Sequence, residues 1–159
     1  MNKIPQLKKR LRQFDASAVL GGIFGDAQLA MIAGVNEFGV TIDVTDKMRA
    51  FLAANGLYLK KTTTTITIPE RSFLRSTFDN KGVINRILKK TGDFIYQIDV
   101  DEKKVLDIIG VNLVAAIRRK IKSNIGPENH PFTIKQKGGK NKTLINESHL
   151  LQGITFKIE

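Results

Sequence analysis

The feature that most constrains this chain is one long amphipathic segment in its second half, at residues 102–124. Apolar side chains recur there at spacings of three and four residues, which predicts a helix with one buried side. At about 1.5 Å per residue this helix would be roughly 34 Å long, enough to cross a small domain. Its last two turns are rich in Arg and Lys, which suits the negative end of the helix dipole. We therefore expect the core to lie along this helix.

Four shorter segments are also predicted to be helices, three of them because their apolar residues follow the same spacing and residues 27–37 because Asp26 can cap a helix there. Counting the long helix, five helices are predicted, and side chains that typically cap a helix N-terminus precede three of them. Gly39 stands where a C-terminal cap is expected. The shorter segments are residues 4–14, 27–37, 47–54 and 82–98, and the predicted caps are Asp26, Thr45 or Asp46, and Asp99 or Asp101.

The first of these segments, residues 4–14, combines its apolar spacing with a cluster of Lys and Arg. Such a basic amphipathic helix can lie on a membrane or pack on a partner. We expect residues 1–15 to form an N-terminal arm that packs on this chain's own core or on a neighbouring copy.

Extended segments are interspersed with these helices, which favours the α+β class. The expected architecture is a single domain over residues 16–159, with a small antiparallel or mixed sheet packed against the long helix. Residues 69–78 are predicted as a turn or short helix, residues 135–142 as a mobile basic loop and residues 147–152 as a helical turn. The predicted extended segments are residues 16–24, 60–68, 132–134 and 154–158.

Composition excludes several classes of protein. The chain has no cysteine, so it has neither a disulfide scaffold nor a thiolate site. No apolar run approaches the roughly 20 residues that a membrane span needs, and no signal peptide is recognisable. We therefore expect a protein made in the cytoplasm, with no membrane partner. The formal net charge of +11 suits nucleic acid or an acidic protein surface, without choosing between them.

The sequence contains no pattern that predicts an active site. The two histidines, His130 and His149, have no second metal-type ligand at a regular helical spacing. Asp99, Asp101 and Glu102 match the start of a calcium loop, but Lys103 stands where a ligand is needed and no glycine follows, so a helix cap explains them better. We predict no catalytic, cofactor-binding or metal-binding residues and no cofactor. A hydrolase is the weakest alternative, since no nucleophile–base pair is visible.

Basic residues form two groups that could contact phosphates or dock on an acidic partner. Aromatic residues do not interleave with them as base-stacking platforms do, so specific base reading is not expected. The alternative for each group is an ordinary solvated face. The candidate residues are Arg118, Arg119, Lys122, Lys135, Lys137, Lys140 and Lys142.

Three segments, in order, carry a family resemblance. The first ends in Asn-Glu-Phe-Gly at residues 36–39, and the second is Ile-Pro-Glu-Arg-Ser-Phe-Leu-Arg at residues 68–75. The third runs along the long helix to Pro-Glu-Asn-His-Pro-Phe-Thr at residues 127–133, and continues through residues 144–150 to the closing strand. Together they resemble the tail-completion or neck proteins of tailed bacteriophages, also called virion morphogenesis proteins. Asn146 and Ser148 depart from the Asp and Gly that are common in that family.

The resemblance implies a structural virion protein and no enzyme. Such proteins form a ring, expected here to have six copies, at the neck between the head connector and the tail. The implied partners are copies of the chain, the adjacent connector or adaptor ring, and the tail terminator or tail tube proteins. DNA passing through the channel would make weak, non-specific contacts. A tail terminator that caps the tube is the nearest alternative, and a small basic DNA-binding protein is an alternative from another class.

Ring contacts would draw on an exposed turn that combines rigid, apolar and guanidinium groups, a set enriched at interfaces. The alternative is that Phe73 and Leu74 belong to the core, while Arg71 and Arg75 pair with carboxylates of the same chain. The strand before this turn could also pair with a neighbour's sheet edge. The candidate interface residues are Glu37, Phe38, Pro69, Arg71, Phe73, Leu74 and Arg75.

Overall fold

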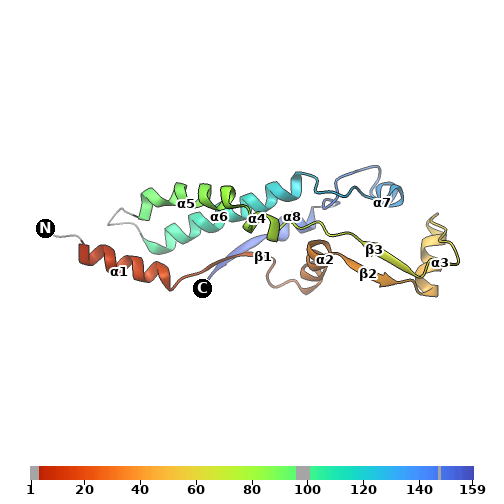
Figure 1. Ribbon diagram of the computed structural model, residues 1–159, viewed down its shortest axis with the longest axis horizontal. Coiled ribbons are helices and arrows are strands. Elements are labelled where there is room, and N and C mark those ends of the chain that lie inside the picture. Colours follow the sequence, from red (N-terminus) through yellow and green to blue (C-terminus); the bar gives the residue numbers. More distant parts are fainter. Residues whose placement is uncertain (1–3, 96–100, 147) are drawn as a thin grey trace.

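The computed structural model describes residues 4–95, 101–146 and 148–159 of the chain. The molecule is elongated, with α1 near one end and α3 at the other (Figure 1). In chain order the elements are α1 (Ile4–Asp15), β1 (Val19–Gly22), α2 (Ala27–Phe38), β2 (Val40–Asp43), α3 (Asp46–Ala54), β3 (Thr65–Ile68), α4 (Arg75–Phe78), α5 (Lys81–Ile95), α6 (Glu102–Lys122), α7 (Pro131–Gln136), α8 (His149–Gly153) and β4 (Thr155–Ile158).

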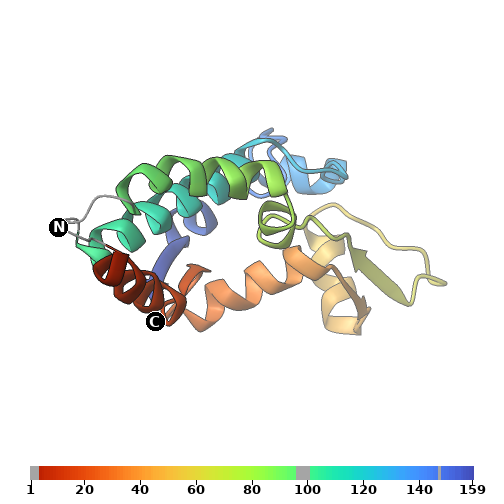
Figure 2. The same ribbon diagram turned by 60° about the vertical axis from the view of Figure 1, so that its left-hand side comes forward.

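The core follows α6, as the sequence predicted. α5 runs beside α6, and strands β1 and β4 pack on another side of it (Figure 2). Gly110 lets β4 approach closely, because a Cβ atom at this position would collide with the ring of Phe156. The buried apolar residues of α6 are Val105, Leu106, Leu113, Val114, Ala116, Ile117 and Ile121.

The strands form two separate antiparallel pairs rather than one sheet. β1 pairs with β4, with Val19 opposite Ile158, and this pair packs against α6 as expected. β2 pairs with β3, with Val40 opposite Ile68. The second pair lies at the end of the molecule away from α1 and the start of α6 (Figure 1). The α+β class and the small antiparallel sheet against the long helix are thus confirmed, and the β2–β3 pair is a second sheet beside it.

The predicted caps are confirmed where the structure describes them. The Asp26 side chain accepts a hydrogen bond of 2.8 Å from Leu29 N, and Thr45 Oγ1 accepts one of 3.2 Å from Met48 N. Asp101 Oδ1 accepts from Lys103 N at 3.1 Å. The alternative cap Asp99 and the last three residues of the helix predicted over residues 82–98 lie outside the described residues.

Two extended segments are predicted wrongly. Residues 132–134 belong to helix α7, because His130 Nδ1 accepts from Phe132 N at 3.2 Å and Pro131 suits the first helical turn. β3 includes only the last four residues of the predicted strand over 60–68. The Arg49 guanidinium donates to the carbonyl oxygens of Lys60 (3.0 Å) and Thr63 (2.7 Å), which holds the preceding residues in a turn.

The predicted loop over residues 135–142 begins inside α7, whose last residues are Lys135 and Gln136. The chain then turns at Gly138 and Gly139, which both have positive φ. Lys137 Nζ donates to the carbonyl oxygens of Lys142 (2.7 Å) and Thr143 (3.2 Å). This lysine therefore closes a turn within the segment that was expected to be a mobile basic loop.

Candidate functional site

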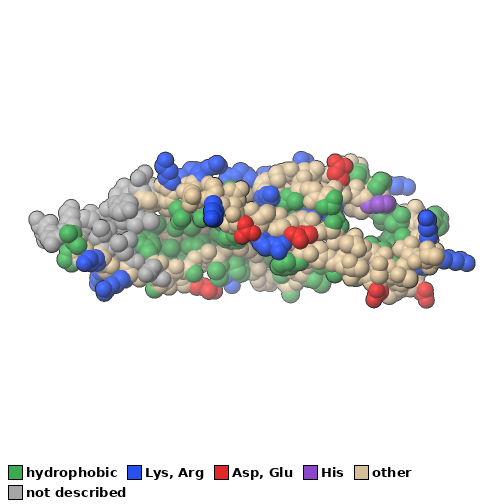
Figure 3. All heavy atoms as spheres, viewed as in Figure 1, with side chains coloured by type: hydrophobic (Ala, Val, Ile, Leu, Met, Phe, Trp, Pro, Cys, Tyr) green, Lys and Arg blue, Asp and Glu red, His purple; other side chains and the backbone are tan. Residues whose placement is uncertain are grey.

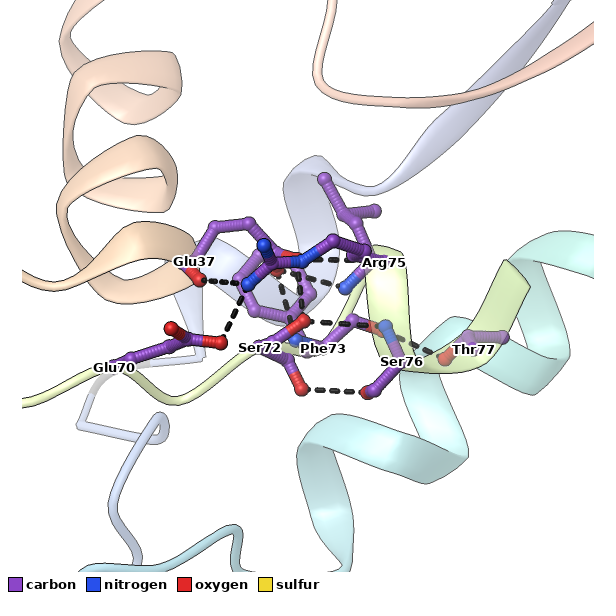
Figure 4. A network of polar contacts seen from close by, with 8 residues as sticks. Glu37, Glu70, Ser72, Phe73, Arg75, Ser76 and Thr77 are labelled. Atoms are coloured by element: carbon purple, nitrogen blue, oxygen red, sulfur yellow. Dashed lines mark hydrogen bonds and ion pairs between the residues drawn. The ribbon is translucent and has the colours of Figure 1, made fainter. Parts of the chain in front are cut away.

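A buried carboxylate joins the end of α2 to the start of α4. Glu37 is only 3% exposed, and its carboxylate accepts hydrogen bonds from Ser72 Oγ (2.5 Å) and from the backbone N–H groups of Phe73 (2.8 Å), Leu74 (2.9 Å) and Arg75 (2.8 Å) (Figure 4). The first N–H groups of a helix have no partner within the helix. Glu37 satisfies those of the cap residue Leu74 and of Arg75 from a distant part of the chain, and with its bond to the Phe73 N–H it fixes the turn before α4.

The pKa of the Glu37 carboxyl lies below its ordinary value. Burial by itself raises this pKa, but the hydrogen bonds from Ser72 and from the three backbone N–H groups outweigh burial and stabilise the ionised form. Glu37 is therefore a charged cap at neutral pH.

Arg75 covers the outer side of this junction. Its guanidinium forms an ion pair with Glu70, and its Nε lies 3.9 Å from a carboxylate oxygen of Glu37. Its Cζ also lies 5.3 Å from the centre of the Phe38 ring, within the range of a cation–π contact. Arg75 thus pairs with carboxylates of its own chain, which was the alternative to a role in a subunit interface.

Arg71 reaches to the other side of the junction. Its Nε donates to the carbonyl oxygen of Pro127 at 2.9 Å, and its second guanidinium nitrogen donates to that of Glu128 at 3.2 Å. Its backbone N–H donates to Asn36 O at 2.7 Å. Arg71 is buried and burial lowers the pKa of its guanidinium, but no carboxylate of a described residue pairs with it.

The turn at residues 68–75 is therefore not the exposed surface that the sequence suggested. Glu37, Arg71 and Phe73 are buried within the subunit, while Pro69 and Leu74 are half-buried. The prediction of an exposed turn is wrong, because hydrogen bonds to the Glu37 carboxylate and packing in the core bury these residues. Only Phe38 and Arg75 among the seven candidates are well exposed.

The same junction unites the segments that carry the family resemblance. Glu37 from the first segment bonds to Ser72 and its neighbours in the second, and Arg71 bonds to the third. No local pattern could have revealed these bonds, because the partners lie 35 to 57 positions apart in the sequence. Residues of these motifs, such as Glu37 and Arg71, therefore form hydrogen bonds that link the three segments in the fold.

The junction also clamps both ends of a projecting arm, which we define as residues 40–68 (β2, α3 and β3). The arm extends away from α5 and the start of α6 (Figures 1 and 2). A Cβ atom on Gly39, at its base, would lie 2.8 Å from Glu70 N, so the two ends are tightly apposed. Large side chains of the arm are open to solvent, with Phe51 64% and Tyr58 81% exposed. Aromatic residues are enriched at protein–protein interfaces relative to the rest of the surface.

The predicted basic residues have different surroundings. Arg118 donates to the carbonyl oxygens of Gln152 (3.3 Å) and Ile154 (3.0 Å), so it ties α6 to the end of α8. With Arg119 and Lys122 it lines a groove between α6 and β4, which we call the α6–β4 groove. Burial, and then the nearby Arg71, lower the pKa of Lys137, which closes its turn as described above. The other lysines of the second group, Lys135, Lys140 and Lys142, are exposed.

A basic row on α5 was not predicted from the sequence. Its four members are exposed, and none forms an ion pair with another described residue. Basic side chains lie along the upper edge of the molecule in Figure 3, on the side of α5. The row consists of Lys81, Arg86, Lys89 and Lys90.

Among the described residues, no group of three or more His, Asp or Glu side chains is arranged to hold a metal ion. Within the same residues, no helix combines the length and the apolar character that crossing a bilayer requires. Comparisons with protein-family models, curated proteins and solved structures found no match for this chain. The family resemblance therefore rests on the three sequence segments.

Proposed function

We propose that this chain is a structural virion protein of a tailed bacteriophage. It forms a ring of six copies at the neck, completes the tail and joins it to the head connector. Its action is geometric and requires no chemistry. Its partners are copies of itself, the adjacent connector or adaptor ring, the tail terminator or tail tube proteins and, weakly, the DNA that passes through the channel.

The projecting arm is the observation that carries this proposal. A ring requires a contact between two different surfaces of each subunit, so that each copy binds the next and the series closes. An arm that is clamped at its base by the Glu37 junction, and that exposes Phe51 and Tyr58, is suited to reach a neighbour. A clamped base lets the arm keep one direction, which a ring of fixed copy number needs.

Stoichiometry in purified virions of the encoding phage tests this proposal. Quantitative mass spectrometry against a tail tube protein of known copy number should give about one ring of the chain per particle. The proposal predicts that particles lacking the chain have unjoined heads and tails. A chain that is absent from virions, or present in hundreds of copies, contradicts it.

Non-specific DNA binding is a second candidate, favoured by the basic row on α5. Four exposed cations without described ionic partners could contact phosphates, and such binding weakens steeply with salt. The test is a titration of duplex DNA with the full chain at several salt concentrations. Tight binding at moderate salt that K89Q together with K90Q abolishes would favour this candidate. Weak binding at low salt alone agrees with DNA passing through a ring.

A further inference from the structure

A small pocket lies beside the Glu37 junction, between α2 and the segment that leads into α8. Its volume is about 270 Å³. Asn36 lines it at the end of α2, and the carbonyl oxygen of this residue accepts from the backbone N–H of Arg71. Lys137 lines it from the turn after α7. We call this cavity the Lys137 pocket.

The Lys137 pocket contains an ammonium group, and no carboxylate of a described residue lines it. Lys137 Nζ donates to the carbonyl oxygens of Lys142 (2.7 Å) and Thr143 (3.2 Å). An ammonium group has three N–H donors, so one of them is without a partner among the described residues.

A second cation increases the positive charge near the pocket. The buried guanidinium of Arg71 is close enough to Lys137 to contribute to the lowering of the pKa of that lysine. Neither cation forms an ion pair with a carboxylate of a described residue. Because two like charges that are partly removed from water repel each other, an anion in the pocket would stabilise both.

Two neutral donors lie on the same pocket wall. Asn146 and Ser148 line the pocket, and neither side chain forms a hydrogen bond with another described residue. Both the amide N–H₂ and the hydroxyl can donate to an oxygen atom. The pocket therefore offers three kinds of free donor to a bound oxyanion.

The rest of the lining restricts the kind of anion. Binding pockets for small molecules are mostly apolar, and a few polar groups fix the orientation of the ligand. One free ammonium N–H suits a single negative charge, and the aliphatic side chains suit a short hydrocarbon chain. A doubly charged phosphate would leave oxygens against this apolar wall without donors. The apolar lining residues are Leu29, Ile32, Leu144 and Leu150.

We propose that the Lys137 pocket binds a small aliphatic carboxylate. The carboxylate accepts from the free N–H of Lys137 and from the side chains of Asn146 and Ser148, and the hydrocarbon part contacts the apolar residues of the pocket. One subunit contains the whole site, so this proposal is independent of the neck ring.

A titration of the full-length chain with sodium butyrate tests the proposal, with sodium chloride added to keep the ionic strength constant. Two-dimensional NMR of the backbone amides reports binding, and thermal unfolding reports stabilisation by the ligand. We expect saturable shifts at residues 143–146 and 148–150, and a saturable rise in melting temperature. Acetate should bind several-fold more weakly, because it buries less hydrocarbon.

Three variants locate the site. Lys137→Gln removes the charge, and Asn146→Asp places a carboxylate beside it, so each should weaken butyrate binding by about tenfold or more. Asn146 is exposed, so its substitution should not impair folding even if the loss of Lys137 opens the turn. Lys140→Gln is the matched control, because it removes the same charge from an exposed position nearby. It should change the affinity by less than about twofold.

Four outcomes would overturn the proposal. The first is a wild-type chain without saturable shifts, and the second is an equal response of wild type, Lys137→Gln and Asn146→Asp, which indicates a general salt effect. The third is saturation by inorganic phosphate but not by butyrate. The fourth concerns Glu147, which lies outside the described residues. Butyrate binding that occurs only in Glu147→Gln would show that the chain's own carboxylate occupies the pocket.

Discussion

The carboxylate of Glu37 accepts a hydrogen bond of 2.8 Å from the backbone N–H of Phe73, and both residues are buried. Glu37 lies just before the projecting arm and Phe73 just after it, so this bond ties the two ends of the arm to the body. A buried hydrogen bond to a charged group is among the stronger polar interactions in proteins. The arm's direction therefore depends on a carboxylate outside the arm itself.

The first prediction concerns Glu37→Gln. The substitution removes the charge that four hydrogen bonds stabilise, and we expect it to lower the free energy of unfolding by about 2–3 kcal/mol at neutral pH. Urea denaturation followed by circular dichroism measures this value. Glu70→Gln is the matched control, because Glu70 is exposed and pairs with Arg75 at the surface, and it should cost less than about 1 kcal/mol. Equal costs for the two variants would contradict the account.

The second prediction is the pH dependence of the same junction. The pKa of Glu37 is lower in the folded chain than its ordinary value of 4.5. Its contribution is therefore fully present above the unfolded pKa and is lost as the pH falls through the folded pKa. The gap in unfolding free energy between wild type and Glu37→Gln should be constant near neutrality and shrink below pH 4.5. A gap that widens on acidification would show that the carboxyl is protonated in the folded chain.

The third prediction concerns Arg71, which bonds to the carbonyl oxygens of Pro127 and Glu128. Arg71→Met keeps much of the aliphatic volume but leaves two carbonyl groups without this donor, so we expect a loss of about 2 kcal/mol in stability. Arg86→Met, on the exposed face of α5, should change stability by less than about 0.5 kcal/mol. Thermal unfolding of both variants in the same buffer compares them. Similar melting temperatures would mean that Arg71 does not link the two segments.

The fourth prediction tests the packing of β4 on α6. Gly110→Ala places a Cβ atom against the Phe156 ring, so the strand must shift, at a cost of about 1–3 kcal/mol. Gly34→Ala, within α2, meets no atom within 4 Å and should stabilise the chain by about 0.5–1 kcal/mol, because alanine favours helix over glycine. Denaturant midpoints measured side by side give the sign of each change. Stabilisation by Gly110→Ala would contradict the described contact.

Local chemistry explains which parts of the fold the sequence could predict. The caps at Asp26, Thr45 and Asp101 bond within two or three residues, so their patterns contain the information needed. The long helix was predicted because its apolar residues recur at spacings of three and four, which is also a local pattern. The helix α7 was missed because its start depends on the His130 side chain acting as a cap, a less common choice than Ser, Thr, Asp or Asn.

The candidate site was predicted less well, because it depends on long-range bonds. Glu37 and Phe73 were expected at a subunit interface, yet they bond to each other across 36 positions. Arg118 was expected to face DNA or a partner, but its guanidinium bonds to carbonyl groups of a segment more than 30 positions away. The exposed residues of the arm and of α5 could be identified as surface residues only from the folded structure.

The mass of the purified protein in solution, with and without tails that lack it, tests the central claim most directly. The account predicts a free species that becomes a ring of fixed copy number on the tail ends. A protein that stays monomeric, does not bind the tails and instead shifts duplex DNA at moderate salt would contradict the neck-ring proposal and favour the DNA-binding alternative.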